Sequence, residues 1–187
     1  MKYLVLICYF IAANVYAAAP FGVEWGESIT DYGIIKSDMD DGILEVGNLP
    51  KNHSQASKYT LEEIASQGIQ RVSMKTGLFD LYSKEGELLF EEIKTALLNS
   101  DYLLESHRQG TLSSYKCLIQ SYCYGDIWVG IDGNGDHVSL TILSSGRREG
   151  YINVEFSSSI YADIRAQEKI QELAVAELAR LQDSLVF

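Results

Sequence analysis

Basic residues are scarce in this sequence, which has 15 lysine and arginine residues against 26 aspartate and glutamate residues and a formal net charge of −11. Such a chain has no excess of positive charge to displace counterions from phosphates, so we expect no nucleic-acid partner. The same deficit disfavours binding to anionic membrane surfaces. Prolines are also few, with two in 187 residues, and 47% of the residues are hydrophobic. This composition excludes a disordered or low-complexity chain.

Long apolar runs are lacking beyond the first residues of the chain. The one such run, residues 3–19, is short for a membrane span, is interrupted by Asn14 and has no basic residue directly after it. Lys2 precedes the run, and Val15 and Ala17 fit the −3 and −1 positions of a signal-peptidase site. Residues 1–17 are therefore predicted to be a signal peptide. We expect a periplasmic or secreted bacterial protein, with no stable membrane span after cleavage near Ala17.

Cysteine is limited to three residues, of which Cys8 lies in the predicted signal peptide. In an oxidising compartment Cys117 and Cys123 are expected to form one disulfide. On one straight strand they would lie about 20 Å apart, which is beyond disulfide reach, so the chain must turn between them. Thioredoxin-type redox chemistry uses a two-residue spacer, so this spacing favours a structural bond.

Motifs for metal binding or catalysis are missing as well. The three histidines have no zinc-ligand spacing, and no nucleophile elbow or glycine-rich phosphate loop is present. Asp132, Asn134 and Asp136 follow the spacing of a calcium loop, but His137 and Leu143 occupy positions where an EF-hand needs glycine and glutamate. The Asn-Gly pair between two apolar runs instead predicts a hairpin turn. We expect no catalytic residues, no metal and no cofactor.

Side-chain periodicity predicts one helix in the middle of the chain and several strands. Residues 83–99 have apolar side chains three and four apart, which predicts a helix that Ser83 caps. Residues 58–65 fit either a capped helix or the first strand of a hairpin, and we favour the hairpin because so short a helix is marginal. The predicted strands are 43–46, 58–65, 69–74, 114–119, 126–131, 137–143 and 151–156.

The end of the chain predicts a long helix over residues 158–187, because this segment contains no glycine or proline. Within it Ala174, Leu178, Leu181 and Leu185 form an apolar seam. The seam fits a helix that docks on a partner or a second copy, or one that packs across its own sheet. Together the elements predict an α+β fold in a single domain, residues 18–187, in which an antiparallel β-meander packs with a central helix and the long C-terminal helix.

Aromatic residues gather around the two cysteines. The segment between Cys117 and Cys123 and the residues next to it contain Tyr115, Tyr122, Tyr124 and Trp128. Such a cluster can stack on sugars or peptides, because aromatic rings give a large contact area at low entropic cost. The alternative is that these residues reflect strand propensity at a half-buried sheet edge. We consider the four residues a possible binding surface.

The mature N-terminus carries the pattern Phe21-Gly22-x-x-Trp25-Gly26-x-Ser28. It resembles the start of small secreted or periplasmic bacterial proteins that begin FGxxWGxS and have no known activity. Gly68-Ile69-Gln70-Arg71-Val72 and the helix after Ser83 fit the same order. The resemblance implies an exported α+β domain and supplies no catalytic residues.

These features predict a non-catalytic binding or interaction module in the periplasm or outside the cell, with a protein or glycan partner. Two alternatives remain open. One is a hydrolase of envelope polymers that uses an aspartate or histidine of the hairpin loops. The other is a structural homo-oligomer formed through the C-terminal helix.

Overall fold

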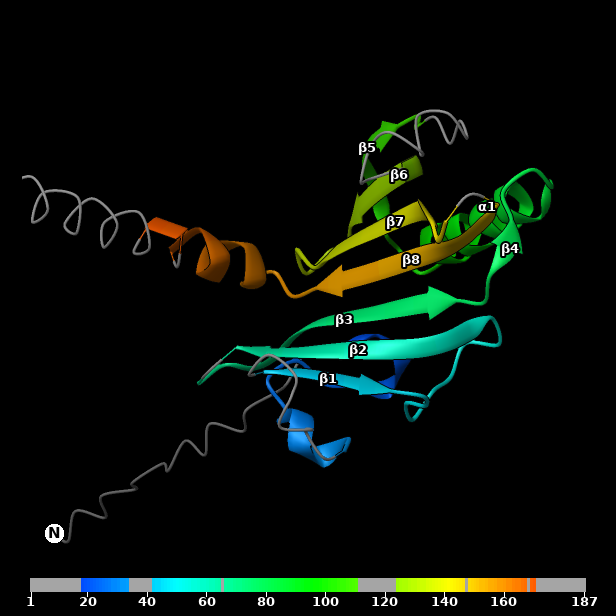
Figure 1. Ribbon diagram of the computed structural model, residues 1–187. Coiled ribbons are helices and arrows are strands. Elements are labelled where there is room, and N and C mark those ends of the chain that lie inside the picture. The colour runs from blue at the N-terminus through cyan, green and yellow to red at the C-terminus, as the bar shows by residue number, and fades with distance from the viewer. Residues whose placement is uncertain are drawn as a thin grey trace, which may run out of the picture.

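A computed structural model describes residues 18–33, 42–64, 66–110, 124–146, 148–167 and 169–170. In it the chain forms one antiparallel sheet of eight strands in the order β1-β2-β3-β8-β7-β6-β5, with β4 beside β8 (Figure 1). The strands are β1 (Ile43–Val46), β2 (Ala56–Ile64), β3 (Gly68–Thr76), β4 (Phe79–Asp80), β5 (Leu103–Arg108), β6 (Tyr124–Ile131), β7 (His137–Ser144) and β8 (Glu149–Ser157). The helices are α1 (Glu85–Asn99) and two short 3₁₀ turns, η1 (Pro20–Gly22) and η2 (Ile29–Asp31).

The prediction of an α+β fold with a long C-terminal helix over residues 158–187 was wrong. The structure is mostly antiparallel sheet, and its last described residues are helical only at 161–167 and 169–170. The strands also do not follow one another as a simple meander, because β8 lies between β3 and β7. Packing across its own sheet was one of the two roles considered for a long terminal helix, but α1 and residues 18–33 cover the apolar face.

Local patterns predicted most of the other elements correctly. The hairpin over residues 58–74 is confirmed as β2 and β3, and the helix over 83–99 is confirmed as α1. Three of the predicted strands in the second half of the chain are β6, β7 and β8, whereas the predicted strand 114–119 lies outside the described residues. The sequence did not indicate β5, and all six of its residues are exposed. A strand without a buried face has no alternating apolar pattern to reveal it.

Alternation along the strands gives the sheet one apolar and one polar face. In β8 the buried residues Ile152, Val154 and Phe156 alternate with half-buried polar ones, and β7 repeats the pattern. Antiparallel pairing aligns these residues across strands, so that Met74 lies opposite Val154. Successive side chains of a strand point to opposite faces. Half-buried apolar residues such as Leu143 therefore lie on one side, and the buried apolar residues of the aligned strands lie on the other. This side carries the core.

Helix α1 covers the apolar face behind β7 and β8 (Figure 1). Its buried residues Phe90, Ile93 and Leu97 recur every three to four positions, which matches the helical repeat. The hydroxyl of Ser83 accepts a hydrogen bond from the Glu85 N–H, and Glu85 and Glu87 lie at the positive end of the helix dipole. The N-cap residue is Lys84, one position after the predicted Ser83, and its own side chain makes no capping bond. No helix in the described ranges is long and apolar enough to cross a membrane.

Residues 18–33 close the other half of the apolar face. Val23, Trp25 and Ile29 of this segment are buried. Ser28 is the N-cap residue of η2, and its hydroxyl accepts the Thr30 N–H. The Gly26 N–H donates to the Ile69 carbonyl, and the Ile69 N–H donates to the Glu27 carbonyl. These bonds attach the segment to the start of β3.

Gly68 makes that attachment possible. Its φ of +67° lies in the left-handed region, and a Cβ atom there would lie 2.1 Å from the carbonyl oxygen of Gly26. Only glycine has no Cβ, so only glycine fits both the turn and the close approach of the two backbones.

Replacing Gly68 with alanine is expected to lower the free energy of unfolding by about 3 kcal/mol, because it combines backbone strain with a clash against backbone atoms. Urea denaturation followed by circular dichroism measures the loss. Gly133→Ala is the matched control, since nothing lies within 4 Å of a Cβ at that position, and it is expected to change stability by less than about 0.5 kcal/mol. Equal stability of the two variants would contradict the assigned role of Gly68.

Candidate functional site

The apolar side of the sheet contains a cavity of about 360 Å³ between α1, the sheet and the N-terminal segment. Its volume lies at the lower end of the range of small-molecule sites, about 300–1,000 Å³. We call it the α1 cavity. Its lining residues are Ala18, Ala19, Pro20, Phe21, His53, Met74, Ile93, Ala96, Leu97, Ser100, Tyr102, Asp132, Val154 and Phe156.

Three elements supply the apolar walls of the α1 cavity. Met74 and Val154 belong to the paired strands β3 and β8 and lie opposite each other in register. Ile93 and Leu97 face them from α1, with Ala96 at an exposed position of the same helix. Because the strands and the helix turn their apolar sides toward each other, the interior of the cavity is largely apolar.

Aromatic rings form a further part of the lining. The ring of Phe156 lies 5.5 Å from that of Phe21 in an edge-to-face arrangement and 5.9 Å from the ring of Tyr102. Phe21 has a φ of 60°, which is unusual for a residue with a side chain. Such a conformation costs about 1–3 kcal/mol and persists where the surrounding structure enforces it. Here it accompanies the packing of the Phe21 ring between Tyr59 and Phe156.

Polar groups of the α1 cavity come from Asp132, Tyr102, His53 and Ser100. Burial, with a smaller contribution from the carboxylates of Asp132 and Asp136, raises the pKa of Tyr102 to about 12. The phenol is therefore protonated at neutral pH and can donate a hydrogen bond. Its hydroxyl has no hydrogen-bond partner among the residues that the structure describes.

The hairpin between β6 and β7 positions Asp132. Oδ1 of Asp132 accepts the N–H groups of Asn134 and Asp136 at 2.8 and 2.9 Å. This pattern is the self-capping turn that aspartate favours. Asp136 in turn is buried, and its carboxylate accepts hydrogen bonds from Trp25 Nε1 at 2.7 Å and from the Ser159 N–H at 2.8 Å. These bonds fasten the hairpin to the N-terminal segment and to the residues after β8, so Asp132 is held in place.

His53 and Ser100 complete the polar groups. Nδ1 of His53 accepts the Gln55 N–H at 3.2 Å, which leaves Nε2 to carry the ring proton. The hydroxyl of Ser100 donates to the Ala96 carbonyl at 3.0 Å. Neither contact uses the full hydrogen-bonding capacity of the side chain.

A second hollow of about 480 Å³ lies along the N-terminal half of α1, toward β4 and β6. Its lining includes the carboxylates of Glu87, Glu91 and Asp126. Glu91 already pairs with Lys94, and Asp126 accepts the Gly110 N–H and lies 3.8 Å from His107. In the described part of the chain no group of three or more histidine, cysteine, aspartate or glutamate side chains is arranged to hold a metal. This hollow therefore offers less definite chemistry than the α1 cavity.

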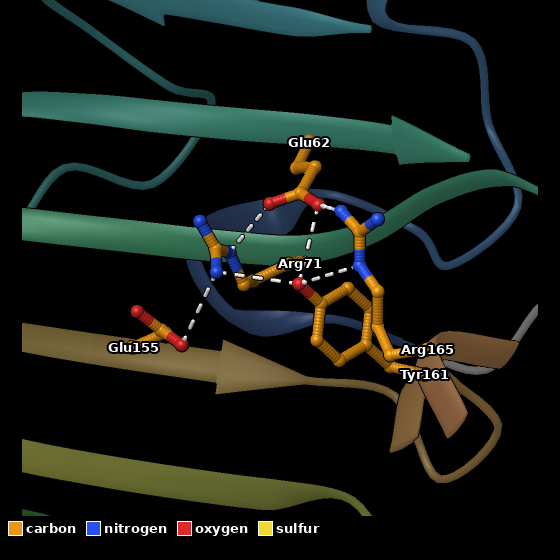
Figure 2. Close-up of polar contacts among 5 residues, drawn as sticks. All are labelled: Glu62, Arg71, Glu155, Tyr161 and Arg165. Carbon is orange, nitrogen blue, oxygen red and sulfur yellow. Dashed lines mark hydrogen bonds and ion pairs between the residues drawn. The ribbon is translucent and has the colours of Figure 1, made fainter. Parts of the chain in front are cut away.

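The polar face of the sheet carries an ion-pair network around Glu62 (Figure 2). The side chain of Glu62 is 6% exposed and pairs with Arg71 Nε at 2.8 Å and with Arg165. The Tyr161 hydroxyl donates to Glu62 at 3.2 Å, and Arg71 also pairs with Glu155 at 3.5 Å. Tyr161 and Arg165 belong to the helical residues after β8. The network thus fastens this segment to β2 and β3.

Most of the binding residues predicted from sequence lie outside the described residues. This holds for Cys117, Cys123, Tyr115 and Tyr122, and also for the seam Ala174, Leu178, Leu181 and Leu185. Tyr124 is the first residue of β6. Trp128 is 2% exposed, and its indole packs beside Gly130 in the core, so its ring does not form part of an exposed surface.

Sequence reasoning did not find the residues of the α1 cavity. Asp132 was recognised only as a turn residue, and Phe21 only as part of a terminal motif. Tyr102 stands in no motif, and His53 stands in no motif for ligand binding. A cavity assembled from the N-terminus, α1, a hairpin and two strands has no local spacing to detect. The one local signal was the hairpin turn between β6 and β7, which places Asp132 at the end of the sheet.

Comparisons of the chain with protein-family profiles, with curated proteins and with solved structures find no match.

The Glu62 network yields a prediction about stability. Glu62→Gln removes the charge that neutralises Arg71 and Arg165 in a mostly buried place, and is expected to lower the free energy of unfolding by about 2 kcal/mol. Glu45→Gln is the matched control, because its pair with Lys58 at 2.6 Å is exposed on the same sheet, and it should cost less than about 1 kcal/mol. Chemical denaturation of both variants tests the difference. Equal losses would show that the Glu62 network stabilises the fold no more than the exposed pair does.

Proposed function

We propose that this protein is an exported, non-catalytic binding module that holds a small, largely apolar molecule in the α1 cavity. The observation that carries the proposal is the cavity itself, with apolar walls from α1, β3 and β8 and a few polar groups. Sites of this composition are typical of small-molecule binding.

The construction of the α1 cavity supports binding by a preformed site. Met74 and Val154 are held by strand pairing, and Asp132 is held by the hairpin and its link through Asp136 to Trp25. A site built on regular elements loses little conformational entropy when a ligand enters. The cavity is thus suited to selective binding of one class of molecule.

Binding is favoured over hydrolysis by the way the carboxylates are used. Hydrolases of glycan polymers place two carboxyl groups on either side of the bond that is cleaved. Of the two aspartates near the cavity, Asp136 is buried and accepts one N–H on each carboxylate oxygen. This leaves Asp132 as the carboxylate that faces a ligand, and a single carboxylate can orient a ligand without cleaving it.

The proposed location rests on the sequence of the first residues. Lys2, the apolar run and Ala17 form the pattern of a cleaved signal peptide. Cleavage after Ala17 would begin the chain at Ala18, which lines the α1 cavity.

Expression of the full chain in a bacterium is expected to yield a protein that fractionates outside the cytoplasm and begins at Ala18. Intact-mass analysis and N-terminal sequencing identify the cleavage site. Ala17→Leu replaces the small residue that signal peptidase requires and should block processing, whereas Ala12→Leu lies within the leader outside the −3 and −1 positions and should be processed normally. A cytoplasmic protein that retains Met1 and Lys2 would refute the proposed export.

Ligand entry into the α1 cavity is expected to change the NMR signal of the Met74 methyl group, because Met74 lies in the cavity wall. The chain has three methionines, so selective ¹³C-methyl labelling gives a simple spectrum. n-Octanol is the probe, since its neutral chain tests the apolar walls alone. We expect a saturable shift of the Met74 signal.

Two variants of α1 test whether octanol binds inside the α1 cavity. Ala96→Phe puts a ring into the cavity from an exposed helix position and should abolish the saturable shift. Thr95→Phe makes a comparable change at an exposed neighbouring position that does not line the cavity, and it should leave binding intact. Circular dichroism checks that both variants fold. A Met74 signal that octanol does not move in the unaltered protein would refute the proposed function.

A further inference from the structure

We propose that the α1 cavity selects a ligand that carries a protonated amine on an apolar or aromatic body. This inference deepens the proposed function and rests on it. It concerns the polar groups of the cavity, whereas the proposed function concerns its volume and apolar walls.

The carboxylate of Asp132 provides the first argument. Its Oδ1 is occupied by two backbone N–H groups, but Oδ2 accepts only the side-chain amide of Asn134, at 3.3 Å. A carboxylate oxygen has two lone pairs, so Oδ2 retains capacity for a donor that enters the cavity. A charged donor forms a shorter and stronger bond there than a neutral one.

The aromatic lining provides the second argument. The rings of Phe21, Tyr102 and Phe156 all border the same space. The face of an aromatic ring attracts a cation within about 6 Å of its centre, and the attraction grows where water is displaced. A cationic group in the cavity would therefore be attracted both by the faces of the aromatic rings and by the Asp132 carboxylate.

The charges around the cavity provide the third argument. No lysine or arginine lines it in the described part of the chain. Above the pKa of an α-amino group at Ala18, an anionic ligand would therefore meet Asp132 without a cationic group of the protein to balance it. The formal net charge of −11 also attracts cations to the protein and repels anions. The protonated hydroxyl of Tyr102 and the Nε2–H of His53 are neutral donors, which suit an additional hydroxyl or carbonyl of the ligand.

Three eight-carbon probes that differ only in the head group test the inference: n-octylamine, n-octanol and n-octanoate. The titrations use the Met74 methyl signal at about pH 9. At this pH an alkylamine keeps its proton, while an α-amino group at Ala18, with a pKa of about 7.7–8.0, has lost most of its charge. We expect octylamine to bind at least about tenfold more tightly than octanol, and octanoate to bind most weakly.

Asp132→Asn removes the charge but keeps an oxygen that can accept the two N–H groups of the turn. In this variant the affinity for octylamine should fall to that for octanol, and the affinity for octanol should not change. Glu149→Gln removes the same charge at an exposed position that does not line the cavity, and should preserve the order of the three probes.

The outcomes separate this inference from the proposed function. If octanol and octanoate shift the Met74 signal with the same affinity as octylamine, the cavity binds ligands but does not select an amine, and the inference is refuted. The same holds if Asp132→Asn binds octylamine as tightly as the unaltered protein. If none of the three probes shifts the signal, the proposed function fails, and the inference fails with it.

Discussion

The antiparallel pairing of β3 with β8 is the contact on which the rest of the structure depends. It runs from Arg71 opposite Ser157 to Lys75 opposite Asn153 and joins the N-terminal hairpin to the C-terminal strands. The helix α1 and strands β5 to β7 all lie between the two strands in the sequence, so the pairing closes a long loop. The entropy cost of that closure is offset by the continuous apolar face that the joined sheet presents to α1 and residues 18–33.

The same pairing gives the two faces of the sheet their different roles. On one side Met74 and Val154 form the floor of the α1 cavity, and on the other Arg71 links Glu62 with Glu155. Adjacent residues of a strand point to opposite sides, so both arrangements arise from a single register. A shift of one residue would exchange the two sets and bury the charges. The ionic network therefore also acts against an incorrect register.

The α1 cavity places its functional groups on elements that the core already holds. The aromatic rings of Phe21 and Phe156 come from the N-terminal segment and β8, and Asp132 comes from a hairpin that Asp136 fastens to Trp25. A ligand would thus meet a rigid site with one carboxylate, one protonated phenol and a largely apolar interior. This arrangement supports the proposed recognition of a small molecule by shape and charge.

Local pattern determined much of the secondary structure: α1, the β2–β3 hairpin, β6 to β8 and the turn at Asp132–Asp136 all follow from periodicity and turn residues. The exposed strand β5 was not predicted, because no face of Leu103–Arg108 is buried. The long terminal helix was wrongly predicted because a lack of glycine and proline permits a helix but does not supply the tertiary packing that stabilises one. Tertiary structure alone decided the strand order, the placement of residues 18–33 and the α1 cavity. Residues as distant in the sequence as Phe21, Tyr102 and Phe156 meet only through long-range packing. Such packing leaves no regular spacing in the sequence that could predict the cavity.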